Sequence, residues 1–179
     1  EMFFLPEGTR YAPELTPYMQ EPMNLVFDRE VHTIIFVSGA RTSKSLSLID
    51  AVIAVTIKYR PSDILLILAT EAMARRYAKT RTGRMIKNSP ELKSLLSGDR
   101  HDDNVLNKQF KNGSSVWIGS PTPTNLSASD YRFVLWSDVD RGAQKNADGS
   151  IFTQMRKRTQ TFGSSGMTIC ESSPSYDLL

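Results

Sequence analysis

The sequence predicts a single α/β domain with a mainly parallel central sheet flanked by helices. Short apolar runs alternate along the chain with longer amphipathic stretches, and the runs are apolar throughout rather than alternating in polarity. Strands of that kind are buried on both faces, as in parallel sheets that helices cover. The length of 179 residues fits one such domain.

Four apolar runs are the predicted central strands, because they are rich in β-branched and aromatic residues. They are residues 33–37, 64–69, 133–136 and, more weakly, 167–170. Residues 105–109 and 115–118 flank Asn112-Gly113, and an Asn-Gly pair between two such segments is a strong hairpin signal.

Three segments have helical patterns. Apolar residues recur at helical spacing over 44–59, and Pro61 ends that helix because the residue before a proline disfavours helical geometry. A basic helix is expected over 71–87 and a short one over 90–96. Residues 141–150 are polar with two glycines and predict a mobile loop.

The composition excludes several classes of protein. Hydrophobic residues make up 40% of the chain and charged residues 23%, which excludes a disordered or collagen-like chain. A lone Cys170 excludes an internal disulfide and favours a reducing compartment. No apolar run is long enough to span a bilayer, and no signal peptide is recognisable. The ends at Glu1 and Leu179 suggest a fragment of a longer protein.

The net charge of +3 conceals an uneven distribution. Residues 75–93 hold seven Lys and Arg against Glu91 alone, a local charge of +6, which leaves −3 for the rest. Such a segment is either a patch for phosphates or an ordinary solvated helix face.

The segment 36–45 is the most informative part of the chain. It joins a buried strand to a helix and places Lys44 and Ser45 where a phosphate-binding loop has its Lys and its Mg²⁺-binding hydroxyl. The pattern G-x-x-x-x-G-K-[ST] would require glycines at 38 and 43, but Ser38 and Ser43 stand there, with Gly39 displaced. The alternative is a Ser-rich turn in which Thr42 or Ser43 caps the helix.

Asp138 and Asp140 directly follow the apolar run 133–136. Acids at the open edge of an α/β sheet are well placed to hold a metal's water shell and to orient an attacking water. The alternative is that Asp138 caps a helix and Asp140 pairs with Arg141.

Taken together, these segments resemble the ATPase domain of phage terminase large subunits of the lambda-type GpA family. The resemblance covers most of the chain, and the order and spacing of the motifs carry it. The matching segments are 15–22, with Thr16-Pro17-Tyr18, then 40–45, 69–71 with the basic helix after it, 120–127, and Ser172-Ser173-Pro174.

The resemblance implies a P-loop NTPase fold of the RecA/ASCE-like type, with residues 1–179 forming one ATPase domain. The implied activity is ATP hydrolysis with Mg²⁺, which drives double-stranded DNA into a procapsid. The implied partners are DNA, further copies in a homo-oligomeric ring, the terminase small subunit and the capsid portal, with no membrane. The implied location is the host cytoplasm, and a nuclease domain would follow in the full-length protein.

The resemblance also implies roles for individual residues. Lys44 would contact the β- and γ-phosphates, Ser45 would ligate Mg²⁺, and Arg41 would act as an arginine finger in cis or in trans. The implied nucleotide-binding residues are Tyr18, Gln20, Gly39, Ala40, Arg41, Thr42, Ser43, Lys44, Ser45 and Ser173. Tyr18 and Gln20 would contact the adenine, and Ser173 with Pro174 would sense the γ-phosphate.

The acidic motif departs from the family pattern of Asp-Glu after the apolar strand. In that register Ser137 replaces the metal-side acid and Asp138 replaces the catalytic Glu. A slip of one residue would make Asp138 the metal-side acid and Asp140 the base. Either register predicts slow hydrolysis, because Asp is one methylene shorter than Glu and holds the water less well.

Two other functions remain open: a non-hydrolysing nucleic-acid-binding or assembly module, and a helicase-type ATPase, although a monomeric helicase needs a second lobe. DNA would contact either the 75–87 helix or the Arg156-Lys157-Arg158 cluster. We expect Trp117 and Trp136 in the core, Cys170 as a buried hydrophobe, and solvated acids rather than a metal site at 101–103.

Overall fold

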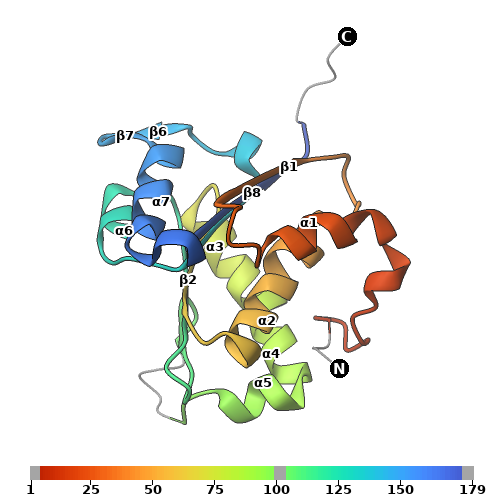
Figure 1. The fold of residues 1–179 in the computed structure, drawn as a ribbon. Coiled ribbons are helices and arrows are strands. Elements are labelled where there is room, and N and C mark those ends of the chain that lie inside the picture. The colour runs from red at the N-terminus through yellow and green to blue at the C-terminus, as the bar shows by residue number, and fades with distance from the viewer. Residues whose placement is uncertain (1–4, 99–103, 175–179) are drawn as a thin grey trace.

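The computed structural model describes residues 5–98 and 104–174, and its centre is a six-stranded sheet (Figure 1). Five strands are parallel, and the edge strand β3 is antiparallel to its neighbour, so the predicted mainly parallel sheet is confirmed. In spatial order the strands are β1 (Thr33–Val37), β8 (Met167–Ser172), β5 (Phe133–Ser137), β2 (Asp63–Ile67), β4 (Ser115–Gly119) and β3 (Asn107–Gln109).

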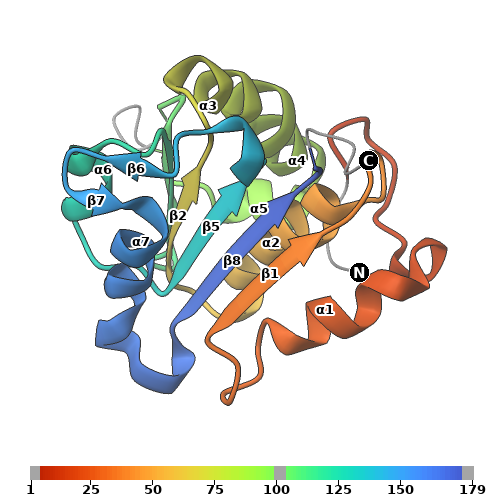
Figure 2. The same cartoon turned by 90° about the horizontal axis from the view of Figure 1, so that it is seen from above.

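Helices cover both faces of this sheet (Figure 2). One face carries α1 (Gln20–Leu25), the π-helical turn η3 (Leu46–Asp50) with α2 (Ala51–Tyr59), α3 (Glu71–Tyr77), the π-helical turn η4 (Ala78–Thr82) with α4 (Gly83–Asn88), and α5 (Pro90–Leu95). The other face carries α6 (Pro123–Ser127) and α7 (Ile151–Thr159). Short 3₁₀ turns are η1 (Pro13–Leu15), η2 (Pro17–Met19), η5 (Val139–Arg141) and η6 (Gln160–Ser165).

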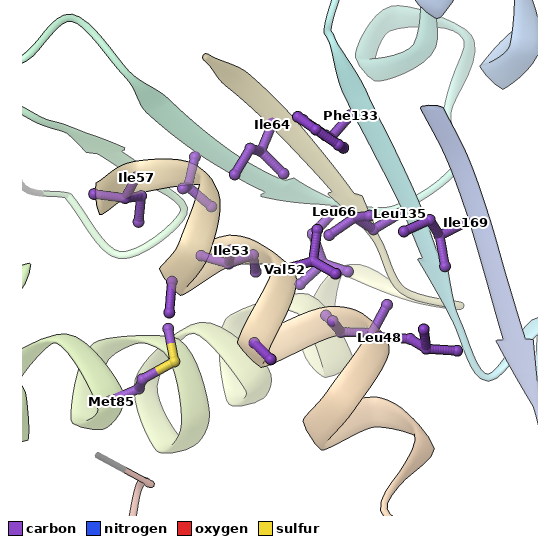
Figure 3. Close-up of a cluster of buried hydrophobic side chains, with 14 of the residues drawn as sticks. Leu48, Val52, Ile53, Ile57, Ile64, Leu66, Met85, Phe133, Leu135 and Ile169 are labelled. Atoms are coloured by element: carbon purple, nitrogen blue, oxygen red, sulfur yellow. The ribbon is translucent and has the colours of Figure 1, made fainter. Parts of the chain in front are cut away.

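The alternation of side chains along the strands divides the core in two. Leu66, Leu135 and Ile169 point to the face of α2, where they meet the apolar side of that helix (Figure 3). Val134 and Cys170 point to the opposite face, in the cluster that contains α7 residues. Each central strand is thus buried on both sides, which is why its sequence is apolar throughout.

The predicted helices and the hairpin are confirmed, with local causes visible at their ends. The chain is helical from Lys44 to Tyr59 and stops before Pro61. Thr70 begins α3 by accepting a hydrogen bond from the Met73 amide at 3.2 Å, a typical helix cap. Gly113 has φ of 84° in the turn between β3 and β4, a conformation that favours glycine.

Two expectations from the sequence are wrong. Trp136 is buried, but Trp117 of β4 is 43% exposed, because it lines an open hollow together with Arg75 and residues 104–107. The segment 141–150 is not an irregular loop throughout: β6 (Lys145–Asn146) and β7 (Gly149–Ser150) pair as a small antiparallel hairpin. Asn146 anchors it through side-chain hydrogen bonds with Gln154 of α7.

Cys170 is a buried hydrophobe, as expected. Its side chain lies in the cluster beneath α7, and the residue is 3% exposed. Burial raises the pKa of the thiol to about 12, so the group stays neutral at physiological pH.

Replacing Leu66 by Ala should lower the free energy of unfolding by about 2–5 kcal/mol, because it leaves a cavity between β2 and α2. Ile35→Ala is a suitable control on the same sheet, since Ile35 is 64% exposed on the edge strand β1. That control should change stability by about 0.5 kcal/mol or less. Urea unfolding followed by circular dichroism measures both, and equal losses would contradict this description of the core.

Candidate nucleotide site

The segment that joins β1 to the following helix is a tight loop at the carboxyl end of the sheet. The Ser38 and Thr42 hydroxyls share a hydrogen bond of 2.6 Å, and Thr42 Oγ1 donates to the Gly39 carbonyl at 2.9 Å. Arg41 and Ser43 have left-handed backbones, with φ of 61° and 60°. Ser43 stands where the phosphate-loop pattern has its second glycine, so it takes a conformation that favours glycine at a cost of about 1–3 kcal/mol.

Lys44 links this loop to the segment that follows β8. Its ammonium group donates to the Gly39 carbonyl at 3.2 Å and to Ser173 Oγ at 2.5 Å, and the residue is only 6% exposed. The Ser38 amide donates to the Ser172 carbonyl at 3.2 Å across the same junction. The loop and the Ser-Ser-Pro segment are therefore in direct contact, although 129 positions separate Lys44 from Ser173.

The remaining sequence-predicted nucleotide residues lie in this loop, in the segment 18–20 and after β8. The Tyr18 hydroxyl donates to the Thr42 carbonyl at 3.2 Å, which brings the Thr-Pro-Tyr segment against the loop. Gln20 is exposed at the start of α1, two positions further on. Arg41 and Ala40 are exposed in the loop itself, and Pro174 is exposed after Ser173.

The acids after β5 lie at the same edge of the sheet. Ser137 is the last residue of β5 and is buried, whereas Asp138 is half-buried and Asp140 is exposed. The Asp140 amide donates to Ser172 Oγ at 3.0 Å, which ties the acidic segment to β8. Asp138 precedes the short turn η5 with φ of 53°, but its side chain makes no capping hydrogen bond.

A third carboxylate, that of Glu171, belongs to the site and was missed in the sequence. Glu171 lies on β8 between β1 and β5 and is completely buried. Its Oε1 accepts hydrogen bonds from Ser45 Oγ at 2.8 Å and from Ser137 Oγ at 2.5 Å. Its Oε2 has no hydrogen-bond partner among the residues that the structure describes. The sequence does contain a signal for this residue, since Glu171 is an acid directly before the Ser-Ser-Pro motif. The predicted strand 167–170 stops short of it, whereas β8 runs two residues further, to Ser172.

These donors fit a magnesium ion only in combination with phosphate oxygens. Within 5–98 and 104–174, no group of three or more His, Cys, Asp or Glu side chains could hold a metal by itself. A serine hydroxyl and a carboxylate with a buried unpaired oxygen are the kind of oxygen donors that Mg²⁺ takes beside a nucleotide. His101 and the acids Asp102 and Asp103 lie outside the described residues.

A second buried polar cluster connects the loop's helix to the basic helix. Asp50 is fully buried, accepts from Tyr77 Oη at 2.8 Å and from Arg81 Nε at 3.0 Å, and forms an ion pair with Arg81. Burial raises the pKa of the Asp50 carboxyl, and the adjacent guanidinium opposes that rise. Arg81 is thus directed inward, and Arg75 pairs with Glu71, so fewer cations of 75–93 are available to phosphates than the charge count indicated.

The topology and the loop define the class of protein. A strand–loop–helix with a buried Lys, in a parallel sheet where one strand separates it from a strand that is followed by acids, is a P-loop NTPase domain of the RecA/ASCE-like type.

Comparison with known families narrows this class. The family model described as "Phage terminase large subunit gpA, ATPase domain" matches residues 6–179. The chain therefore belongs to that family. No curated protein sequence matches it.

Solved structures with the same fold include two terminases. The large terminase of bacteriophage HK97 aligns with a TM-score of 0.73 and 11% identity over 96% of this chain. The large terminase ATPase domain of Thermus phage P74-26 aligns with a TM-score of 0.58 and 16% identity, covering 91% of this chain and 68% of that one. A point variant of the same domain aligns equally well. The present chain spans 35% of the length of the HK97 protein.

One further structural result concerns membranes. No helix in the described ranges is both long enough and apolar enough to cross a bilayer.

Replacing Arg81 by Met should destabilise the protein, because it leaves the Asp50 carboxylate buried without its ion-pair partner. Breaking a fully buried ion pair costs about 3–5 kcal/mol of unfolding free energy. The loss here should be somewhat smaller, because 35% of the Arg81 side chain is exposed. Arg76→Met, at an exposed position of α3, is the control and should have little effect.

The double variant Asp50→Asn/Arg81→Met should recover part of the lost stability, since it removes the unpaired charge. Chemical denaturation measures all three variants. No recovery in the double variant would show that packing, rather than the charge, accounts for the loss.

Proposed function

We propose that this chain binds ATP with Mg²⁺ and hydrolyses it, and that the hydrolysis drives double-stranded DNA into a procapsid. The observation that carries the proposal is the position of Lys44, buried at the start of the helix that follows the loop and hydrogen-bonded to Ser173 across the sheet edge. Membership in a family of terminase ATPase domains supports the same activity.

The chemistry requires positioning and charge neutralisation more than covalent catalysis. Lys44 would contact the β- and γ-phosphates, the amides of residues 39–43 would bind the phosphate oxygens, and Arg41 would neutralise charge on the transferred phosphoryl. Bound Mg²⁺ would neutralise the β- and γ-phosphate oxygens, with Ser45 as one of its ligands. Tyr18 and Gln20 would hold the adenine.

The first of the two acidic registers is better supported. Ser137 shares the Glu171 carboxylate oxygen with Ser45, so the metal-side position corresponds to Ser137. Asp138 then follows at the position that orients the attacking water. The alternative register makes Asp138 the metal-side acid and Asp140 the base, and exposure of Asp140 argues against it.

The contact between Lys44 and Ser173 gives a route from hydrolysis to movement. Both side chains lie at the place proposed for the γ-phosphate. Loss of that phosphate on hydrolysis would therefore alter the hydrogen bond between Lys44 and Ser173, and with it the contact between the loop and the segment ending in Pro174. We infer that Ser173 senses the γ-phosphate in this way.

DNA would meet the region 75–93 rather than α7. Six of its seven cations are exposed, and one of these, Arg75, pairs with Glu71. The other five are Arg76, Lys79, Arg84, Lys87 and Lys93. Of the three α7 cations only Arg156 and Lys157 are exposed, and Arg158 lies 3.7 Å from the Asp130 carboxylate. Backbone phosphates are bound through such charges without regard to sequence, as translocation requires.

Assembly follows from the same proposal. The working protein would be a homo-oligomeric ring in the host cytoplasm that meets the terminase small subunit and the capsid portal. In such a ring Arg41 would act in cis or on a neighbouring copy.

Lys44→Ala should lower ATP turnover at least about 100-fold, because it removes a charge that stabilises the transferred phosphoryl. Lys145→Ala, in the exposed hairpin strand β6, is the matched control and should leave turnover unchanged. Phosphate release with Mg²⁺ and ATP measures both, and equal turnover of wild type and Lys44→Ala would exclude the proposed site.

Two further measurements, nucleotide titration and a strand-separation assay, distinguish the alternatives. A non-hydrolysing assembly module would show no Mg²⁺-dependent ATP binding, and a helicase-type ATPase would separate DNA strands.

The triple variant Arg76→Ala/Lys79→Ala/Arg84→Ala should weaken binding to duplex DNA regardless of sequence. For every DNA phosphate that is no longer neutralised, the slope of log K against log salt concentration should become shallower by about 0.9. Arg156→Ala/Lys157→Ala is the control and should keep the wild-type slope. Fluorescence anisotropy over a salt series measures this, and a larger effect in the α7 control would assign DNA binding to α7 instead.

A further inference from the structure

We propose that Glu171 provides the metal-side carboxylate of this ATPase, so that the acid comes from β8 instead of from the end of β5. The inference rests on the proposed function, since it concerns the Mg²⁺ that accompanies ATP. It assigns a role to a residue outside the recognisable motifs of the loop and the acidic strand.

The first argument is geometric. β5 and β8 are adjacent parallel strands, and the register places Ser137 directly opposite Glu171. Both side chains lie on the face that carries the loop's helix, because the alternation puts Leu135 and Ile169 there too. From β8 the longer Glu side chain reaches the Ser45 hydroxyl, with Oε1 at 2.8 Å. A carboxylate therefore lies beside the proposed Mg²⁺-binding hydroxyl even though position 137 is a serine.

The second argument is the unsatisfied oxygen. Glu171 is completely buried, yet within the described chain its Oε2 accepts no hydrogen bond. Leaving a buried acceptor unpaired costs about 1–3 kcal/mol, and more for a charged group. A carboxylate kept only for structure would be expected to have both oxygens satisfied, as the Asp50 carboxylate has. An oxygen available to a cation explains this difference.

The third argument is the identity of residue 137. An Asp at this position would lie opposite Glu171 on the neighbouring strand, and two buried carboxylates in contact repel each other. Ser137 instead donates a hydrogen bond to Glu171 at 2.5 Å and so holds the carboxylate in place. The two positions thus act as a pair, with the acid on β8 and its hydrogen-bond donor on β5.

The test uses the 179-residue chain and measures Kd for ATP by isothermal titration calorimetry, once with Mg²⁺ and once with EDTA. We expect Glu171→Gln to retain metal-free binding, because Lys44 and the loop amides are intact. The gain in affinity that Mg²⁺ gives the wild type should fall about 10- to 100-fold, the usual loss when a group that orients a metal is removed. The matched control is Glu91→Gln, an equivalent change at an exposed position of α5, which should keep the full gain.

An exchange variant provides the second test. Ser137→Asp/Glu171→Gln returns the acid to β5 and keeps the number of carboxylates, so it applies even where circular dichroism shows that Glu171→Gln alone does not fold. We expect it to restore most of the Mg²⁺-dependent gain.

The outcomes separate the two proposals. A folded Glu171→Gln protein with the full wild-type gain would overturn the role of Glu171 and leave the proposed function standing. An exchange variant that binds metal-free ATP but shows no gain would overturn it too. A wild-type chain that binds no ATP under either condition would overturn the proposed function and this inference with it.

Discussion

The candidate site depends on one constraint, the insertion of β8 between β1 and β5. Parallel strands end at the same edge of a sheet, so this pairing brings the loop after β1, the acids after β5 and Ser173 after β8 together. The register of β8 is held by its core residues, since Ile169 and Cys170 pack on opposite faces. A slip of one residue would turn Glu171 to the wrong face. Packing of the apolar core therefore determines which side chains meet at the carboxyl end of the sheet.

The two buried carboxylates near the loop have different environments and hence different consequences. Both carboxylate oxygens of Asp50 accept hydrogen bonds, one from Tyr77 and one from Arg81, and this network joins the loop's helix to the basic helix. A broken buried ion pair is costly, so the two helices are expected to move as one body. Glu171 accepts two hydroxyl bonds on one oxygen and, within the described residues, none on the other. A carboxylate with hydrogen bonds on both oxygens stabilises the fold, whereas one with an unpaired oxygen is available for a ligand.

The loop itself has a strained backbone, and Lys44 at its end is hydrogen-bonded to the segment after β8. Arg41 and Ser43 hold left-handed conformations without the help of glycine, and the hydroxyls of Ser38 and Thr42 bond across the turn. Strained backbone of this kind persists where the surrounding structure fixes it, and it is concentrated at ligand-binding segments. Lys44 spans from this loop to Ser173, so a phosphate that attracts the ammonium group would compete with that bond. Nucleotide binding and the position of the Ser-Ser-Pro segment would thus be coupled through one side chain.

The sequence by itself determined the local structure: the buried strands, the helix from Lys44 to Tyr59, the Asn112-Gly113 hairpin and the strand-to-helix loop. These follow from periodicity and turn chemistry, which act between near neighbours in the chain. Only the tertiary structure decided which strands are adjacent, and with that the burial of Glu171 beside Ser45, 126 positions away. It also decided that Arg81 faces inward and that Trp117 is exposed, because both depend on which distant segments pack against them. Contacts between distant segments leave no periodic trace in a single sequence, and the metal-side acid proposed here is such a contact.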